Sequence, residues 1–341
     1  MSQDLYRNQI RELVESVRLE ESNVIVRDRK IDLASVETSV LGQQREFVLL
    51  RLQQIIYNEF YCGIPIELGG LTDTNDNRAV LGDCFLRRLS QFNNGSEAWD
   101  RGWSLETVSP HGLATLAKGG ERKFVNFGEF VAADSFQLPL RPGSVVNIYQ
   151  PREVTQAGNY FYYVLGSKML PHPTFSNQVR FYWSIEAEGM YLLVSLLTAT
   201  LNKYRIPFSL KCPSVPGHFA RRDAAVLYAT ASHVKLLCDL ISGFYHEVVA
   251  HLRPDSPAFT KPLASGLSFA ESPKDGESFG MARAKLIAEG LLNAHSEGAK
   301  DCDQQLQEVL RTFERLGYDL ERLYCNPLSH YPYNFGGFEN K

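Results

Sequence analysis

Apolar and polar residues alternate along VRFYWSIE, which spans residues 179–186. An alternation with a period of two predicts a strand whose successive side chains point to opposite faces. One face would carry the apolar residues Val179, Phe181, Trp183 and Ile185. The other face would carry Arg180, Tyr182, Ser184 and Glu186. We expect this second face either to meet solvent or to line a binding site.

The same alternation recurs over residues 206–211, IPFSLK, and predicts a second strand with a polar face. A short apolar run over 224–229, rich in strand formers, predicts a third strand. Prolines and a glycine between the two runs indicate a turn of fixed shape rather than a helix. The strand ends and the turn carry Lys211, His218, Arg221, Arg222 and Asp223. Adjacent strand ends would deliver these groups to one anion site; solvated strand ends are the alternative.

Apolar residues at helical spacing predict helices toward both ends of the chain. They lie over residues 5–17, 47–60, 189–204 and 234–248, after Ser278, and over 306–316. Short β-type runs between 104 and 130, separated by Gly and Pro, predict a β meander. This order favours an α+β fold with a mixed or antiparallel central sheet, flanking helices and a helical N-terminal region.

The chain has 341 residues, of which 44% are hydrophobic, so it can bury a sizeable core. We divide it into a helical N-terminal region (1–100), an α+β catalytic-like region (101–330) and a tail (331–341). We expect the first two regions to form one compact unit.

Charge and composition exclude several classes of protein. A net charge of −4 argues against a general nucleic-acid binder, which would be basic over a whole face, so an anion site must be local. The sequence has neither an apolar stretch long enough to span a membrane nor an N-terminus typical of a signal peptide, so we expect a cytoplasmic protein. The six cysteines form no CxxC pair and the eight histidines no HExxH motif, so we expect no metal site.

The common nucleotide and hydrolase motifs do not occur: the Walker loop, GxGxxG after a strand, the GxSxG elbow, and the kinase HRD and DFG pair. What remains is a set of cations at polar positions of otherwise apolar segments: Arg180, Lys211, Arg221, Arg222, Lys261 and Arg283. Arginine forks match phosphate geometry, so a cleft that collects several of them would select a phosphorylated ligand. For each arginine taken singly, a surface ion pair is the alternative.

Six segments occur in a characteristic order: LSQFNNGSEAWDRGW, VRFYWSIEAEG, LTATLNKYRIPFSLK, RRDAAVLY, PAFTKPLASG and ESFGMARAKLIAEGL. The order resembles the HopPsyA-type (HopA effector) family of type III secreted effectors and their stand-alone bacterial relatives, from about residue 49 to residue 331. The resemblance implies an α+β fold with a basic groove.

Relatives outside plant pathogens are associated with the biosynthesis of modified peptides, including class V lanthipeptides and thioamitides. The resemblance implies that they work beside a kinase-like phosphotransferase. Their implied role is to eliminate phosphate from phosphoserine or phosphothreonine in a precursor peptide, which gives dehydroalanine or dehydrobutyrine. The expected partners of this chain are therefore a phosphorylated precursor peptide and a phosphotransferase, with no nucleic acid and no membrane.

Such a β-elimination needs a base for the Cα proton and cations for the carbonyl oxygen and the departing phosphate. Lys211 is our candidate base, because neighbouring arginines would lower the pKa of its amine. Lys261 competes for the role of base or of enolate stabiliser. No metal or organic cofactor is required.

The other roles follow from residue chemistry. Arg180, Arg221 and Arg283 would grip phosphate, with Arg222 as a fourth arginine. His218 is the candidate acid, whereas Asp223 and Tyr182 would orient neighbouring groups. Two alternatives stay open. A non-catalytic phosphopeptide-binding module would use the same arginines without a lysine of lowered pKa, and a type III effector-like protein would act on host immune proteins.

Overall fold

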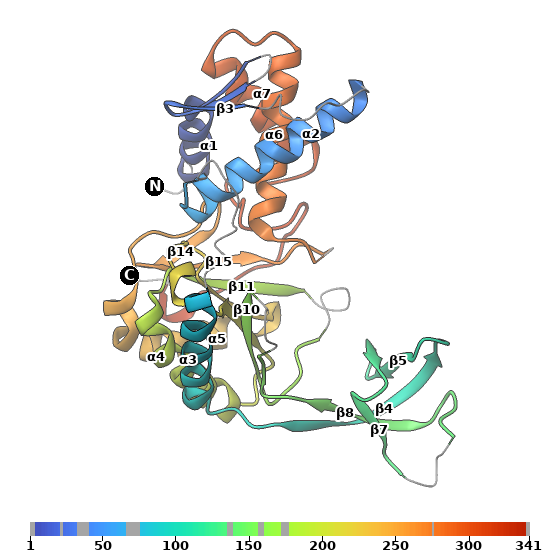
Figure 1. The fold of residues 1–341 in the computed structure, drawn as a ribbon. Helices are drawn as coiled ribbons and strands as arrows, with labels where there is room; N and C mark the ends of the chain where they lie inside the picture. The colour runs from blue at the N-terminus through green and yellow to red at the C-terminus, as the bar shows by residue number, and fades with distance from the viewer. Residues whose placement is uncertain are drawn as a thin grey trace.

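The computed structural model describes residues 4–20, 23–32, 41–65, 76–134, 139–155, 160–171, 177–274 and 276–338, with 32, 41–44 and 76–82 described in backbone only. These residues form three parts: a mainly helical part at the top of Figure 1, a central sheet, and a small sheet that extends away from both.

The mainly helical part joins the two ends of the chain. Its N-terminal elements are α1 (Leu5–Ser16), β1 (Val17–Leu19), β2 (Asn23–Val26), β3 (Arg29–Asp32), α2 (Leu41–Ile56) and the π-helix η1 (Tyr57–Cys62). Its C-terminal elements are α6 (Phe279–Ser296) and α7 (Cys302–Arg315). Helix α2 packs against α6 and α1 packs against α7, so segments from opposite ends of the sequence lie side by side (Figure 1).

The central sheet has seven strands in the order β14-β15-β11-β13-β12-β10-β9. Their bounds are β9 (Glu153–Val154), β10 (Phe161–Leu165), β11 (Gln178–Trp183), β12 (Ser209–Pro213), β13 (Ala225–Thr230), β14 (Lys261–Ala264) and β15 (Leu267–Glu271). Every pair of neighbouring strands is antiparallel. The predicted α+β class with an antiparallel central sheet is therefore confirmed.

Further helices complete the core. The long ones are α3 (Asp76–Phe92), α4 (Ala187–Lys203) and α5 (Val234–Val248), and in Figure 1 the central sheet lies between them and the mainly helical part. The short 3₁₀ turns are η4 (Pro216–His218), η5 (Ala231–His233), η6 (Val249–His251) and η7 (Gly336–Phe338). Both faces of β11 are buried: Phe181 is 0% exposed, but Arg180 on the opposite face is also only 7% exposed. The polar face of this strand therefore lies inside the protein.

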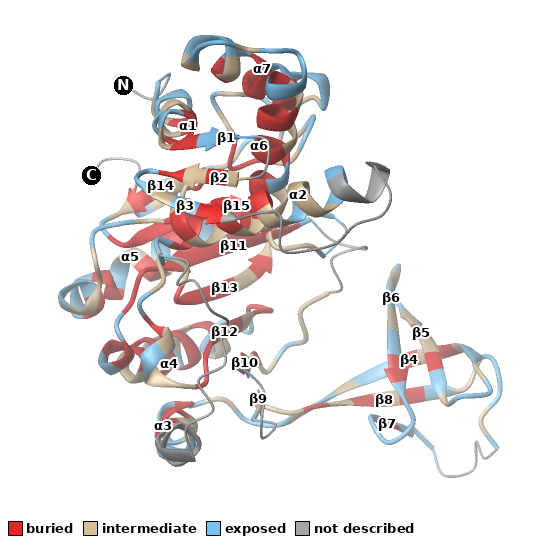
Figure 2. Ribbon diagram, turned by 45° about the horizontal axis from the view of Figure 1, so that its top comes forward, coloured by how far each residue is buried: buried red, intermediate tan, exposed pale blue. Residues whose placement is uncertain are grey.

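The small sheet has its own core. Its strands, in the order β6-β5-β4-β8-β7, are β4 (Ala98–Val108), β5 (Leu113–Lys118), β6 (Glu121–Asn126), β7 (Phe130–Ala132) and β8 (Val145–Gln150). Strands β4, β5 and β6 pair in chain order as a meander, whereas β8 pairs with β4 and β7 pairs with β8. The buried residues of this sheet form a cluster separate from the main core (Figure 2). The division that the sequence suggested between residues 100 and 101 falls within β4.

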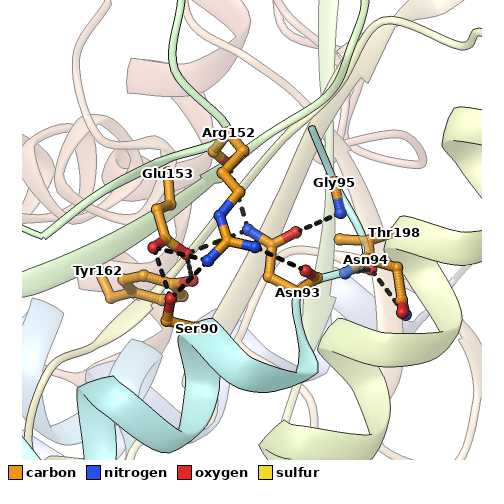
Figure 3. Close-up of polar contacts among 8 residues, drawn as sticks. All are labelled: Ser90, Asn93, Asn94, Gly95, Arg152, Glu153, Tyr162 and Thr198. Atoms are coloured by element: carbon orange, nitrogen blue, oxygen red, sulfur yellow. Dashed lines mark hydrogen bonds and ion pairs between the residues drawn. The ribbon is translucent and has the colours of Figure 1, made fainter. Parts of the chain in front are cut away.

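One hydrogen-bond network holds both connections between the small sheet and the rest of the protein (Figure 3). Asn93, before β4, donates from Nδ2 to the carbonyl oxygen of Arg152, after β8, and Arg152 Nη1 donates back to the Asn93 carbonyl, each at 3.2 Å. Glu153 accepts from Ser90 Oγ on α3 and from Tyr162 Oη on β10, each at 2.6 Å. The network therefore ties the two connecting segments to each other, to α3 and to β10.

The structure differs from the sequence-based prediction in two regions, near the N-terminus and in the tail. The N-terminal region, expected to be helical, also contains a three-stranded sheet of β1, β2 and β3. Each of these strands has only three or four residues, which is too short for a periodic pattern to be recognised in the sequence. The tail after residue 330 packs onto the core, where Phe335 and Phe338 are each 6% exposed.

Candidate functional site

Strand register brings several predicted site residues to one face of the central sheet. Arg180 on β11 pairs with Tyr228 on β13, and Tyr182 pairs with Val226. Val226 in turn pairs with Lys211 on β12. Side chains paired across neighbouring strands point to the same face. Arg180, Tyr182 and Lys211 therefore project to one side, opposite Phe181 and its apolar neighbours.

A pocket of ≈ 240 Å³ opens on this face. It is lined by five of the predicted site residues, Arg180, Tyr182, Lys211, Arg221 and Asp223. The aromatic residues in its wall are Tyr57, Tyr61, Phe161 and Tyr228, and the remaining lining residues are Ala224, Val226, Gly276 and Ser278. Three cations against one carboxylate make this wall positively charged, as an anion site requires.

Lys211 has the properties of a base. Its ammonium lies 3.7 Å from the centroid of the Phe161 ring and makes no hydrogen bond or ion pair to a residue in the described ranges. Burial lowers the pKa of Lys211 from 10.5 to about 8; Asp223 opposes the shift, and the charges of Arg221 and Arg180 add to it. This amine is therefore still mostly charged at pH 7, but the pKa of about 8 gives it a far larger neutral fraction than a lysine with the ordinary value of 10.5.

Arg221 is locked in place by its neighbours. Its Nε and Nη2 donate to the two carboxylate oxygens of Asp223 at 2.7 and 2.9 Å, and Nη2 also donates to Tyr57 Oη at 2.8 Å. Burial lowers the pKa of Arg221, but the paired Asp223 carboxylate outweighs it and the net shift is upward. Arg221 is therefore permanently charged, and Asp223 orients it as the sequence suggested.

Arg180 is held by backbone and side-chain acceptors next to the pocket. Its Nε donates to Ser272 Oγ at 3.0 Å, and its Nη2 donates to the carbonyl oxygen of Glu277 at 2.7 Å. The guanidinium carbon lies 5.3 Å from the centroid of the Tyr228 ring. Tyr182 lies beside it and is 2% exposed. Among the described residues, no group lies in hydrogen-bonding geometry to the Tyr182 hydroxyl. A ligand oxygen in the pocket would satisfy that hydroxyl.

Sequence reasoning missed the contribution of the π-helix η1. Tyr57 and Tyr61 stack with ring centroids 5.5 Å apart, and Tyr61 meets Tyr182 edge to face at 6.3 Å. The close approach needs Gly280 on α6, since a Cβ there would lie 2.5 Å from the Tyr61 ring. The available signal was a pair of tyrosines four residues apart at the end of a predicted helix. π-Helical turns are themselves frequent at functional sites.

Four predicted residues lie outside the wall of this pocket: Lys261, Arg283, Arg222 and His218. Lys261 on β14 pairs with Phe269 on β15, which pairs with Phe181, so Lys261 belongs to the opposite face of the sheet. Its ammonium lies 5.1 Å from the centroid of the Phe335 ring. This register removes Lys261 as a competing base.

Arg283 is fully buried in α6, with 0% exposure. Its Nε and Nη2 donate to the carbonyl oxygens of Leu323 and Cys325 at 3.0 and 2.6 Å, and Nη1 donates to Tyr318 Oη at 3.0 Å. Each nitrogen of the guanidinium is thus bonded to the segment that follows α7. Arg283 therefore holds the fold and is not positioned to grip phosphate.

Arg222 and His218 lie beside the pocket rather than in its wall. Arg222 Nη1 donates to the carbonyl oxygen of Phe60 at 3.0 Å, which clamps the end of η1. A Cβ at Gly63, where φ is +74°, would lie 2.9 Å from Arg222 Nε. His218 on η4 stacks on Tyr160 with ring centroids 4.5 Å apart. The geometry therefore gives neither residue the phosphate-binding or acid role that the sequence suggested.

The described residues contain no group of three or more His, Cys, Asp or Glu side chains that could hold a metal ion. No helix among them is long and apolar enough to cross a membrane.

The sequence model of the HopA1 effector protein family matches residues 153–325, slightly more than half of the chain. The chain belongs to the HopA1 effector protein family. The matched segment contains Arg180, Lys211 and Arg221, whereas the small sheet and η1 lie outside it.

Two solved structures of effector proteins are similar to this chain. One is an effector protein from Pseudomonas syringae pv. tomato strain DC3000, with 16% identity, a TM-score of 0.46, and coverage of 96% of this chain and 99% of the other. The second is an effector protein from Pseudomonas syringae pv. syringae strain 61, with 15% identity, a TM-score of 0.41, and coverage of 84% and 98%. A comparison with curated protein sequences found no match.

Proposed function

We propose that this member of the HopA1 family is a phosphoserine or phosphothreonine lyase that acts on a phosphorylated precursor peptide. The observation that carries the proposal is the environment of Lys211. Its amine has a pKa lowered to about 8, makes no hydrogen bond to the described residues, and faces a pocket that also holds Arg180 and Arg221. A neutral amine beside two fixed cations is the combination that β-elimination of phosphate needs.

The reaction would run in one covalent step. Neutral Lys211 takes the Cα proton of the phosphorylated residue, and the Cα–H electron pair becomes the Cα=Cβ double bond. The Cβ–O bond breaks, and its electrons leave with the phosphate. The products are dehydroalanine or dehydrobutyrine, inorganic phosphate and a protonated Lys211. Phosphate has a second pKa of about 6, so it leaves without obligatory protonation.

The remaining pocket residues would bind and orient. Arg221, fixed by its two bonds to Asp223, and Arg180, fixed by Ser272 and Glu277, would offer their outward donors to the phosphate oxygens. Both are anchored before the ligand arrives, so little order has to be gained on binding. The buried Tyr182 hydroxyl would donate to a phosphate or carbonyl oxygen.

Mass spectrometry of a phosphothreonine peptide incubated with the protein tests this function. A lyase releases inorganic phosphate and leaves a peptide one water lighter than its unphosphorylated form. The Lys211→Ala variant should bind the same peptide and leave its mass unchanged. Elimination by Lys211→Ala at the wild-type rate would remove Lys211 from the mechanism.

Membership of the HopA1 effector protein family favours a second candidate, an effector-like protein that works by binding partner proteins. In that case the same pocket would hold a phosphorylated residue of a partner without reaction. Tight binding of the phosphopeptide by wild type with no change of mass, weakened by Arg180→Gln, would favour this candidate over the lyase.

A further inference from the structure

A second and larger cavity, of ≈ 560 Å³, lies between the small sheet and the central sheet. The small sheet contributes Trp103 and the β5–β6 turn at Gly119 to its wall. The central sheet contributes Thr230 at the end of β13, and Ser232 follows in η5. We call this cavity the inter-sheet groove. None of the roles described above uses it.

The groove and the phosphate pocket lie along the same two strands. Arg180 pairs with Tyr228 at the pocket, and the next pair on the same face of the sheet is Gln178 with Thr230, of which Thr230 lines the groove. Two residues of an antiparallel strand span about 7 Å. An extended peptide covers about the same distance with two residues. A peptide with its phosphorylated residue at Arg180 would therefore reach the groove two to three residues further along.

The wall of the groove suits a peptide backbone. The Trp103 side chain is 1% exposed, and its indole N–H has no hydrogen-bond acceptor among the residues that the structure describes. A peptide carbonyl would supply that acceptor. Lys118 and Lys123 both lie near the indole, with ammonium groups 5.6 and 5.5 Å from the ring centroid. Burial lowers the pKa of Lys123 to about 8, so this end of the small sheet is already partly desolvated.

The network at the base of the small sheet anchors the two segments that carry this wall of the groove. Asn93, Arg152 and Glu153 tie both connecting segments to α3 and β10 (Figure 3). A wall held in this way binds without the entropy cost of first ordering a mobile domain.

We propose that the inter-sheet groove binds the segment of the peptide substrate that flanks the phosphorylated residue, in extended conformation. The inference rests on the proposed function in so far as the phosphate pocket receives a phosphopeptide. It adds that recognition extends several residues from the reacting centre, and that the small sheet supplies one wall of the binding site.

Binding of two labelled phosphothreonine peptide libraries tests the inference, by fluorescence anisotropy on the full chain. The short library has one residue on each side of the phosphothreonine, and the long library has eight randomised residues on each side. We expect the long library to bind at least about tenfold more tightly, which corresponds to about 1.4 kcal/mol of flanking contacts. Equal affinities for the two libraries would overturn the inference.

A blocking variant locates the effect. Ser232 is exposed in the wall of the groove, so Ser232→Trp fills the groove without disturbing the core. Ser232→Trp should abolish the tighter binding of the long library relative to the short library, and it should leave binding of the short library unchanged. Ser296→Trp, at the exposed end of α6, is the matched control and should behave as wild type. Trp103→Phe, which keeps an aromatic ring but removes the N–H, should reduce the gain in part.

The outcomes separate the two proposals. Binding of the long library without elimination refutes the lyase and leaves the groove intact. Elimination from both libraries with equal affinity refutes the groove and leaves the lyase intact. A gain in affinity that survives Ser232→Trp would place the flanking contacts elsewhere and would also overturn the inference.

Discussion

Lys211 and Tyr182 lie in one cross-strand row of the central sheet, with Val226 between them. Neighbouring strands are about 4.8 Å apart, so the backbones of the two residues are separated by about 10 Å. Their side chains point into the same pocket. A phosphorylated residue placed between them can therefore meet the amine of Lys211 on one side and the hydroxyl of Tyr182 on the other.

The rate of elimination should rise with pH through the pKa of Lys211. The amine acts as a base only when it is neutral, and burial lowers its pKa to about 8. We expect kcat/KM to rise about tenfold per pH unit below that value and to level off above it. Lys211→Ala should lower kcat/KM by about 10²–10⁴-fold.

Lys261→Ala is the control, because Lys261 lies on the opposite face of the sheet. It should keep the wild-type pH profile. A profile that is flat between pH 6.5 and 9, or one that changes in Lys261→Ala, would contradict the assignment of Lys211.

Replacing Lys211 by methionine should stabilise the protein at pH 7. Burial disfavours the charged amine, so the folded state binds fewer protons than the unfolded state between pH 8 and 10.5, and stability rises with pH in that window. The lowered pKa limits the gain from Lys211→Met to about 3 kcal/mol at pH 7. The gain should shrink as the pH rises toward 10.5. Denaturant unfolding at pH 7 and pH 10 measures both effects, and a destabilised variant at pH 7 would refute them.

Tyr182→Phe should separate binding from stability. The hydroxyl is buried without a well-formed hydrogen bond in the described structure, so its removal costs no native contact of that kind. The aromatic contact with Tyr61 can persist in phenylalanine. We expect the free energy of unfolding to stay the same or to rise by about 1 kcal/mol. Phosphopeptide affinity should fall several-fold, as titration calorimetry would measure; an unchanged affinity would exclude a ligand contact.

Arg283 and Arg180 are the two most buried arginines among the described residues, and we expect their substitution to have different effects. Arg283→Met leaves the carbonyl oxygens of Leu323 and Cys325 without their donor, so it should destabilise the protein by about 3–5 kcal/mol. The folded fraction that remains should keep kcat within about threefold of wild type, because Arg283 lies outside the pocket wall.

Arg180→Met is the variant to compare with Arg283→Met. Arg180 also bonds to Ser272 and Glu277, so some stability will be lost, but the main effect should fall on phosphopeptide binding and turnover per folded molecule. A loss of turnover in Arg283→Met as large as that in Arg180→Met would mean that Arg283 is part of the site.

Glu153 should stabilise the base of the small sheet only at pH values at which its carboxylate is ionised. Burial raises its pKa, but the hydrogen bonds from Ser90, Tyr162 and Asn93 outweigh burial, and the net pKa is lowered from 4.5. A carboxylate with a lowered folded pKa contributes stability that is present above the unfolded pKa and is lost as the pH falls through the folded pKa. Wild type should therefore be more stable than Glu153→Gln at pH 7, and the difference should shrink as the pH falls below 4.5. Hydrogen exchange of the segments around residues 93 and 152 would report it; a difference as large at pH 3 as at pH 7 would contradict this origin.

The sequence by itself determined which side chains share a face within each strand. The period of two is a local property of the backbone, so the alternation over 179–184 and 206–211 was sufficient to group Arg180 with Tyr182 and to expose Lys211 on a polar face. The sequence also suggested that these two strand ends are adjacent, and β12 and β13 are neighbours in the sheet, although the connection over residues 214–224 includes the 3₁₀ turn η4.

Tertiary structure decided which of the cations meet. Lys261 and Arg283 have local sequences as suggestive as that of Lys211, but the register of β14 places Lys261 on the other face, and carbonyl groups beyond α7 capture Arg283. Tyr57 and Tyr61 reach the pocket from a π-helix far away in the sequence. Long-range strand register, and the contacts that satisfy a buried polar group, depend on the whole chain and cannot be derived from a local pattern.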